Sequence, residues 1–182
     1  MIQGVCQLLP LVKGEARRGL KAIKLNMKIH FITIGTKMPG WVEQGYKEYA
    51  QRLTGECQIK AVEIPMEKRG KNPDINRLKQ KEGGKILAAI PKGALVVALE
   101  VTGKHWSTEE LAANLESWLH GGRDVALIVG GPDGLSQDCL QRADIKWSLS
   151  KMTFPHPLVR VVVAEQIYRA YTIIKNHPYH RS

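Results

Sequence analysis

The stretch Ala126–Ser136, ALIVGGPDGLS, decides the fold class because it joins a short apolar run directly to a loop with three glycines. Successive apolar residues are typical of a strand buried on both faces of a parallel sheet. The glycines predict that a ligand approaches the backbone closely, since no Cβ obstructs it. The loop matches neither G-x-x-x-x-G-K-[ST] nor G-x-G-x-x-G, and Pro132 removes an N–H that a phosphate would use. A phosphate-binding loop is therefore excluded, and the loop predicts a different ligand.

Strand-like and helical runs alternate from Met27 onward. The predicted strands are Lys28–Ile34, Gln58–Ile64, Ala94–Glu100, Asp124–Val129 and Ile145–Leu149. The predicted helices are Trp41–Leu53, Pro73–Ile90, Thr108–His120 and Pro157–Lys175. This alternation predicts a largely parallel sheet in an α/β sandwich with right-handed crossovers, in one domain spanning residues 27–182. Ligands of such sheets bind at the carboxyl ends of the strands, where Gly130–Gly134 lies.

Local signals support the predicted helix ends. Ser107 and Glu110 form the pattern of a capping box, and Gly121-Gly122 is a typical helix stop. Pro157 suits the first position of the last helix. That helix is apolar on nearly all faces, which predicts burial and a subunit interface, and Glu165 with Arg169 forms a favourable pair four residues apart.

The composition favours a polyanionic partner. The chain has 182 residues, a net charge of +10 and a pI near 9.6, which points to nucleic acid before an anionic membrane. The cysteines Cys6, Cys57 and Cys139 are far apart, which argues against a disulfide framework and a zinc site and indicates a reducing, cytoplasmic location. No apolar run approaches the length of a membrane span.

Residues 1–26 differ from the rest of the chain. They are basic, their short apolar piece contains Pro10, and no basic residue precedes that piece, so a secretory signal is not expected. The absence of serine argues against a transit peptide. Because Met27 opens directly into a predicted strand, we interpret residues 1–26 as an upstream or non-native extension and expect most of it to be disordered.

A basic run lies between the second predicted strand and the following helix. It holds Lys68, Arg69, Lys71, Arg77, Lys79, Lys81 and Lys85 against Glu67, Asp74 and Glu82. Such charges bind phosphates without reading sequence. A solvated helix face is the alternative interpretation.

The stretches LIVGGPDGLS, WSLSKMTFPHPLVRVVVAEQIYRAY and NHPYHR resemble the RlmH family of ribosomal RNA large-subunit pseudouridine methyltransferases, a minimal branch of the SPOUT class. IGTKMP and KRGKN extend the similarity from Met27 to the carboxyl end. The resemblance implies an α/β-knot fold with a C-terminal deep trefoil knot that binds S-adenosylmethionine, and a homodimer through the C-terminal helix. It also implies methylation of N3 of pseudouridine 1915 in helix 69 of 23S rRNA, on the assembled ribosome in the cytoplasm.

The resemblance further implies a cofactor pocket walled by the glycine loop and the LSKMTF loop. The predicted cofactor residues are Leu99, Gly130, Leu149, Ser150, Lys151, Met152, Thr153 and Phe154. S-adenosylmethionine carries no phosphate, so apolar side chains and bare backbone suit it better than a phosphate loop. The alternatives are that Leu99 is plain core and Gly130 a simple turn.

Methylation at N3 requires loss of an imide proton, so we expect a general base or a cation that stabilises the developing anion. The predicted catalytic residues are His180, His177, Arg160 and Tyr179, with His156, Tyr168 and Arg169 as further candidates. The two histidines rank first because they lie on a tail that could close over the pocket, and Arg160 would stabilise the anion or bind a phosphate. Surface histidines, or for His177 a charge at a helix C-terminus, are the alternatives. The predicted RNA-binding residues are Lys68, Arg69, Lys71 and Arg169.

Two other functions are kept as alternatives. A catalytically inactive rRNA- or ribosome-binding protein would keep the basic surface but tolerate a damaged pocket, whereas the motifs here are intact. A dinucleotide-dependent enzyme would need the glycine fingerprint and a following acidic residue, which the chain lacks. The chain departs from the family pattern in its 26-residue extension and in Ser182 after NHPYHR.

Overall fold

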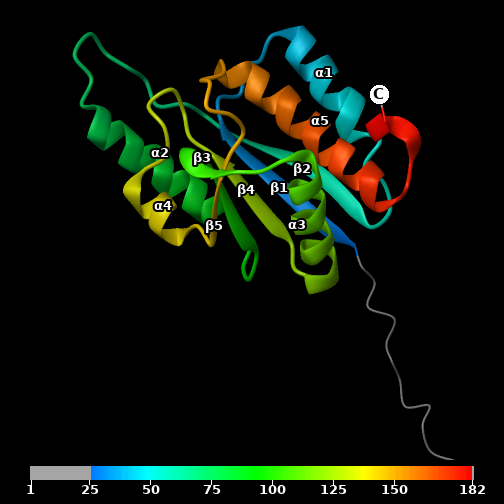
Figure 1. The fold of residues 1–182 in the computed structure, drawn as a ribbon. Coiled ribbons are helices and arrows are strands. Elements are labelled where there is room, and N and C mark those ends of the chain that lie inside the picture. Colours follow the sequence, from blue (N-terminus) through cyan, green and yellow to red (C-terminus); the bar gives the residue numbers. More distant parts are fainter. Residues whose placement is uncertain (1–25, 182) are drawn as a thin grey trace, which may run out of the picture.

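The computed structural model describes residues 26–181, except for the side chains of residues 180 and 181. Within that range, five strands form one parallel sheet in the order β2-β1-β4-β3-β5 (Figure 1). The strands are β1 (Met27–Ile34), β2 (Cys57–Ile64), β3 (Leu95–His105), β4 (Val125–Val129) and β5 (Ile145–Ser148). The predicted parallel α/β sheet is confirmed, and the prediction for residues 1–26 falls almost entirely outside the described residues.

The centre of the sheet is the most apolar part of the sequence. All five residues of β4 are buried, and β4 lies between β1 and β3. Strands with neighbours on both sides and helices on both faces need apolar side chains at every position. This is why ALIV reads as a continuous apolar run and not as an alternating one.

β3 is longer than predicted. The prediction ended it at Glu100, but the strand continues to His105, with an irregularity against β5 between Leu99 and Lys104. A Cβ on Gly103 would lie 2.7 Å from the Lys146 carbonyl carbon, so the glycine permits a close approach of β3 to β5. The exposed residues of this extension carry no apolar pattern that would have revealed it.

Helices cover both faces of the sheet (Figure 1). One apolar cluster joins alternate strand residues such as Phe31 and Leu127 to α1 (Gly40–Ala50), α3 (Thr108–Gly121) and α5 (His156–Ile174). The second cluster joins Ile32 and Ile128 to α2 (Ile75–Ala89) and α4 (Gln137–Arg142). The six-residue α4 was not predicted, because it is too short to show a helical period.

The capping signals are confirmed. Ser107 and Glu110 bond reciprocally at the start of α3, and Gly122 ends it with φ of 64°. α5 begins one residue earlier than predicted, at His156, so Pro157 occupies the second position of the helix and not the first. A short 3-10 helix, η1 (Pro178–Arg181), follows α5.

α5 packs within its own chain. It lies against α1 and α3, and each of its residues is buried or half-buried. The predicted pair is present, with Arg169 Nε donating to Glu165 Oε1 at 2.8 Å. Intrachain packing therefore explains much of the apolar character that predicted a subunit interface. Between residues 26 and 181, no helix is long and apolar enough to cross a membrane.

Candidate functional site

A cavity of about 800 Å³ opens at the carboxyl ends of β4 and β5, beside the middle of β3. Its walls are Leu99–Val101, Val129–Leu135, Trp147–Ser150 and Met152–Phe154, and α5 contributes His156 and Val159. Its volume lies within the range of small-molecule sites in proteins. Three segments that are far apart in sequence meet here because parallel strands end at the same edge of the sheet.

Most of the predicted cofactor residues line this cavity. They are Leu99, Gly130, Leu149, Ser150, Met152, Thr153 and Phe154. Lys151 lies in the same loop but is exposed and does not line the cavity. The geometry thus brings the predicted set together around one hollow, while its contact with a cofactor stays a prediction.

The glycine loop is a tight turn with a bare inner surface. Gly134 N–H donates to the Gly131 carbonyl at 2.9 Å, and Gly134 has φ of +83°. Gly130 is buried, and a Cβ there would lie 2.3 Å from the Gly134 carbonyl carbon. The turn therefore closes only without a side chain at Gly130, which leaves backbone groups facing the cavity.

The opposite wall combines a hydroxyl-braced loop with apolar side chains. Ser148 Oγ donates to the Ser150 carbonyl at 3.1 Å, and Met152 N–H donates to Ser150 Oγ at 3.0 Å. Met152 remains 68% exposed beside the cavity, although it is a large apolar side chain. An apolar ligand group in the cavity would cover such a side chain and gain from its burial.

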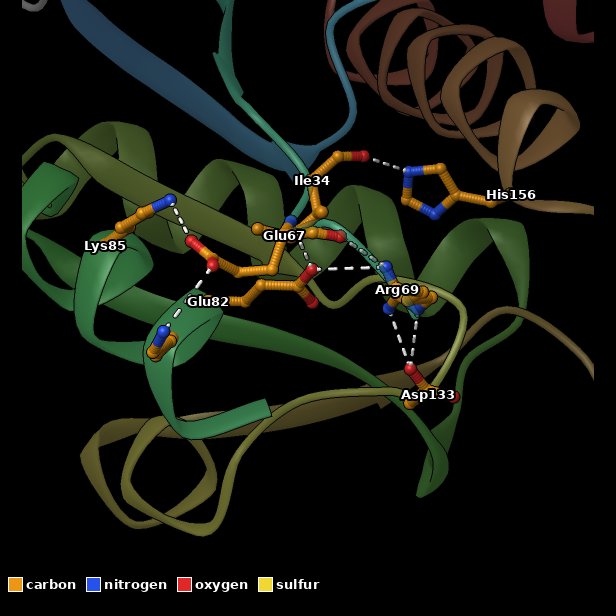
Figure 2. Close-up of polar contacts among 8 residues, drawn as sticks. Ile34, Glu67, Arg69, Glu82, Lys85, Asp133 and His156 are labelled. Atoms are coloured by element: carbon orange, nitrogen blue, oxygen red, sulfur yellow. Dashed lines mark hydrogen bonds and ion pairs between the residues drawn. The ribbon is translucent and has the colours of Figure 1, made fainter. Parts of the chain in front are cut away.

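His156 lies at the edge of the cavity and donates a hydrogen bond to the backbone of β1. Its Nε2 lies 2.7 Å from the Ile34 carbonyl oxygen, which can only accept, so Nε2 carries the proton (Figure 2). Burial, reinforced by the nearby Arg160 charge, lowers the pKa of His156 below its ordinary value. The imidazole is therefore neutral near pH 7, and its Nδ1 is the nitrogen that can accept a proton.

Arg160 lies away from this cavity. Its guanidinium is buried and donates to the Glu63 carboxylate and the Gly35 carbonyl. It lines a smaller cavity of about 300 Å³ together with Tyr46 and Phe31. Within one chain, the structure does not bring Arg160 to the predicted pocket, because Glu63, at the carboxyl end of the edge strand β2, holds it on the β2 side of the sheet.

The C-terminal tail lies at the far end of α5. The Tyr179 hydroxyl donates to Glu165 Oε1 at 3.2 Å, and its ring packs edge-on against Tyr168. Burial, with Tyr49 and Glu165 nearby, raises the pKa of Tyr179 to about 12. Glu165 lies nine residues after His156 on α5, so at 1.5 Å per residue the Tyr179 hydroxyl contacts the helix about 14 Å along its axis from His156. Tyr179 does not line the large cavity of its own chain, and its catalytic role stays a prediction.

The two predicted histidines of the tail stay predictions. His177 is exposed, and its Nδ1 accepts from Tyr179 N–H at 3.2 Å. The side chain of His180 falls outside the described residues. Neither residue lines the large cavity as the structure describes it.

The four predicted RNA-binding residues divide into two groups. Lys68 and Lys71 are exposed in the segment between β2 and α2. Arg69 in the same segment is bound to Asp133 and Glu82 (Figure 2), and Arg169 is bound to Glu165 and lies over the Tyr179 ring. The first pair is available to a polyanion, whereas the second pair is already engaged with carboxylates.

Sequence reasoning missed Glu82. It was counted among the charges of a solvated face, but it is only 2% exposed and lies directly behind the glycine loop. The neighbouring Gly83 was the available signal, since a glycine inside a helix marks a close approach. A Cβ there would lie 2.1 Å from Ser136 Oγ.

The comparisons with known proteins agree with this geometry. Residues 27–180 match the family model described as "Predicted SPOUT methyltransferase". The chain belongs to the SPOUT methyltransferase family. Among its curated relatives, Ribosomal RNA large subunit methyltransferase H of Thioalkalivibrio sulfidiphilus is 56% identical over 155 residues, which cover 85% of this chain and 99% of the relative. The protein of the same name from Methylococcus capsulatus is 57% identical and is covered completely, again over 85% of this chain.

These matches confirm the family predicted from the glycine, LSKMTF and NHPYHR stretches. Among solved structures, a probable methylase family protein from Haemophilus influenzae Rd KW20 superposes with a TM-score of 0.48 at 12% identity, over 85% of this chain and 70% of that chain. Within the described part of this SPOUT methyltransferase, no three His, Cys, Asp or Glu side chains form a metal site.

Proposed function

We propose that this SPOUT methyltransferase methylates N3 of pseudouridine 1915, in helix 69 of 23S rRNA, on the assembled ribosome in the cytoplasm. The observation that carries the proposal is the cavity with its glycine turn, at the ends of β4 and β5 and beside the middle of β3. It is supported by relatives at 55–57% identity that are named Ribosomal RNA large subunit methyltransferase H and are matched over nearly their whole length.

The cavity suits S-adenosylmethionine, which when bound supplies a methyl group on a positively charged sulfur. The cavity is apolar where Leu99, Leu149 and Phe154 line it, and the Gly130 turn offers backbone groups for polar edges. The charged lining is balanced, because Glu100 is offset by Lys79 and Asp133 is paired with Arg69. These residues would hold the adenine ring of S-adenosylmethionine, the polar atoms at its edges and the charged methionine tail.

The N3 proton needs an acceptor, and His156 is the best-placed one in the described chain. Its Nδ1 carries no proton because Nε2 donates to the Ile34 carbonyl. The lowered pKa keeps the imidazole neutral at working pH, so it can take up the proton as the N–C bond forms. The Ile34 carbonyl would stabilise the resulting imidazolium through the same hydrogen bond.

We also propose that the protein acts as a homodimer through α5. The solvent side of α5 keeps a half-buried stripe at helical spacing, made of Leu158, Val162, Gln166, Arg169 and Ile173. A second copy could cover this stripe. The tail, whose His177 and Tyr179 do not line the cavity of their own chain, would then act at the cavity of the partner, which is how His177, His180 and Tyr179 would reach substrate.

The RNA would contact the segment between β2 and α2. Lys68 and Lys71 are exposed there, and Arg77 and Lys79 follow on α2. Lys81 and Lys85 instead pair with Glu67, which reduces their charge toward solvent. Binding through phosphates should weaken steeply as salt rises.

The C-terminal trefoil knot is part of the same proposal. β5 lies at one edge of the sheet, yet α5 packs against α1, whose neighbours are β1 and β2 (Figure 1). The segment between β5 and α5 must therefore cross the ends of β3 and β4, where a threaded chain would pass. A crystal structure that traces this segment outside the β3–α3 connection would contradict the knot.

The test is methyl transfer from labelled S-adenosylmethionine to assembled ribosomes that lack the modification. Free 23S rRNA and ribosomes with uridine in place of the pseudouridine serve as comparison substrates. Label on N3 of one helix-69 pseudouridine, only in assembled ribosomes, is the expected result. Ribosome binding without any cofactor binding would instead favour the inactive rRNA-binding protein.

A further inference from the structure

Arg69 joins the basic segment between β2 and α2 to the glycine loop. Its Nη2 donates to Asp133 Oδ2 at 2.7 Å and its Nε to the same oxygen at 3.3 Å. Asp133 lies in the glycine loop and lines the large cavity, whereas Arg69 does not line it. Figure 2 shows the guanidinium between Asp133 and Glu82, with the loop held on one side and α2 on the other.

Glu82 fixes the other end of this contact. The carboxylate is nearly buried, accepts from Glu67 N–H at 3.0 Å and receives Arg69 Nη1 at 3.4 Å. Its second oxygen lies directly behind the glycine loop, since a Cβ on Gly131 would be 2.9 Å away from it. A buried carboxylate needs a cationic partner, so Glu82 holds Arg69 in position.

We infer that Arg69 is a positioning residue that sets the cofactor-side conformation of the glycine loop and couples it to the RNA-facing segment. The inference rests on the proposed function and deepens it. Arg69 is flanked in sequence by Lys68 and Gly70 and is followed by Lys71, so the exposed lysines and the loop contact belong to one short piece of backbone.

The coupling between the RNA-facing segment and the glycine loop acts in both directions and is favourable. A phosphate bound at Lys68 or Lys71 restrains the backbone that carries Arg69, and this restrains Asp133 through two hydrogen bonds to one oxygen. A cofactor bound in the cavity orders the glycine loop and so restrains Arg69 in return. Coupling between two binding sites is reciprocal. Cofactor and RNA should therefore each bind more tightly in the presence of the other.

The experiment measures S-adenosylmethionine binding by calorimetry in the absence of RNA, for the full chain and four variants. Arg69→Gln and Asp133→Asn each remove one partner, the double variant removes both, and Lys68→Gln is the matched control in the same segment. Each single loop variant should weaken cofactor binding by about tenfold, and the double variant should be no weaker than either, as expected for residues in one ion-pair network. Lys68→Gln should leave cofactor affinity unchanged while weakening ribosome binding.

Steady-state kinetics distinguish a positioning role of Arg69 from a general loss of folded enzyme. In Arg69→Gln the KM for S-adenosylmethionine should rise while kcat at saturating cofactor stays near that of the wild type, and Arg69→Lys should recover part of the affinity. If Arg69→Gln fails to fold, Asp133→Asn carries the same test, since Asp133 is part of an exposed loop. Wild-type affinity in Asp133→Asn, or additive losses in the double variant, would overturn the inference and leave the proposed function intact. A wild-type chain that binds no cofactor would overturn both.

Discussion

Substituting Gly130 by alanine should force the two sides of the glycine turn apart, because the new Cβ would lie between them. The added Cβ would lie 2.3 Å from the Gly134 carbonyl carbon and 2.5 Å from the Leu135 nitrogen. Ordinary contact begins at 3.4 Å, so the turn must move by about 1 Å. Both neighbours are backbone atoms, which cannot rotate away as a flexible side chain would.

This displacement determines how much stability Gly130→Ala loses. Overpacking of a tightly closed site destabilises a protein by about 1–3 kcal/mol. For a domain of this size, 2 kcal/mol corresponds to a Tm lower by roughly 4–8 °C. The same movement shifts the wall of the cavity, so S-adenosylmethionine binding should fall by about tenfold or more.

Two other glycines serve as matched controls. Gly84→Ala adds a Cβ in open space on α2 and should stabilise the chain by about 0.5–1 kcal/mol, since alanine favours a helix. Gly134→Ala meets no atom within 4 Å but must adopt φ near +83°, which costs about 1 kcal/mol without a clash. Thermal unfolding and calorimetric titration measure all three variants.

The order of effects tests the reasoning. Gly130→Ala should lose the most stability and the most cofactor affinity, Gly134→Ala less, and Gly84→Ala none. Wild-type stability and affinity in Gly130→Ala would refute the view that the turn closes only around a bare backbone.

Three further predictions rest on other contacts. Burial lowers the pKa of His156, so its contribution to stability is present above the unfolded value of 6.5 and is lost as pH falls toward the folded value. His156→Gln should flatten the pH dependence of the unfolding free energy in that window, as followed by urea titration. Glu63→Gln should lower the unfolding free energy by about 3 kcal/mol, because it leaves the Arg160 guanidinium, only 5% exposed, without its carboxylate. Arg160→Met should lower it by less, because the Glu63 carboxylate is 37% exposed and can regain water. Burial raises the pKa of the Cys57 thiol to about 12, so peptide-resolved labelling should modify it only as fast as the chain unfolds, and rapid native labelling would contradict its burial.

Much of the fold was predictable because strong local signals agreed with the tertiary structure. The apolar run of β4, the capping box at Ser107 and the glycine stop after α3 each depend on neighbours in sequence. α4 and the end of β3 were missed for the opposite reason. Their limits are set by packing against other elements, which a short or polar stretch does not record.

The candidate site divides in the same way. The glycine and LSKMTF loops were identified as pocket walls because their composition and family resemblance are local properties. The partners of Arg69, Glu82 and Arg160 were not predictable, since each depends on a residue from a distant element. A charged residue read as solvent-facing can be buried when the fold supplies an opposite charge, and one sequence does not show that.

The strand order also has a consequence during synthesis. β1 pairs with β2 on one side and with β4 on the other, and the whole of α2, β3 and α3 is made between β2 and β4. A nascent chain therefore presents one apolar edge of β1 until β4 has left the ribosome, which is an exposure that chaperones recognise. The cavity needs β5 and the loop after it as well, so a bound small molecule can stabilise only chains whose translation is nearly complete.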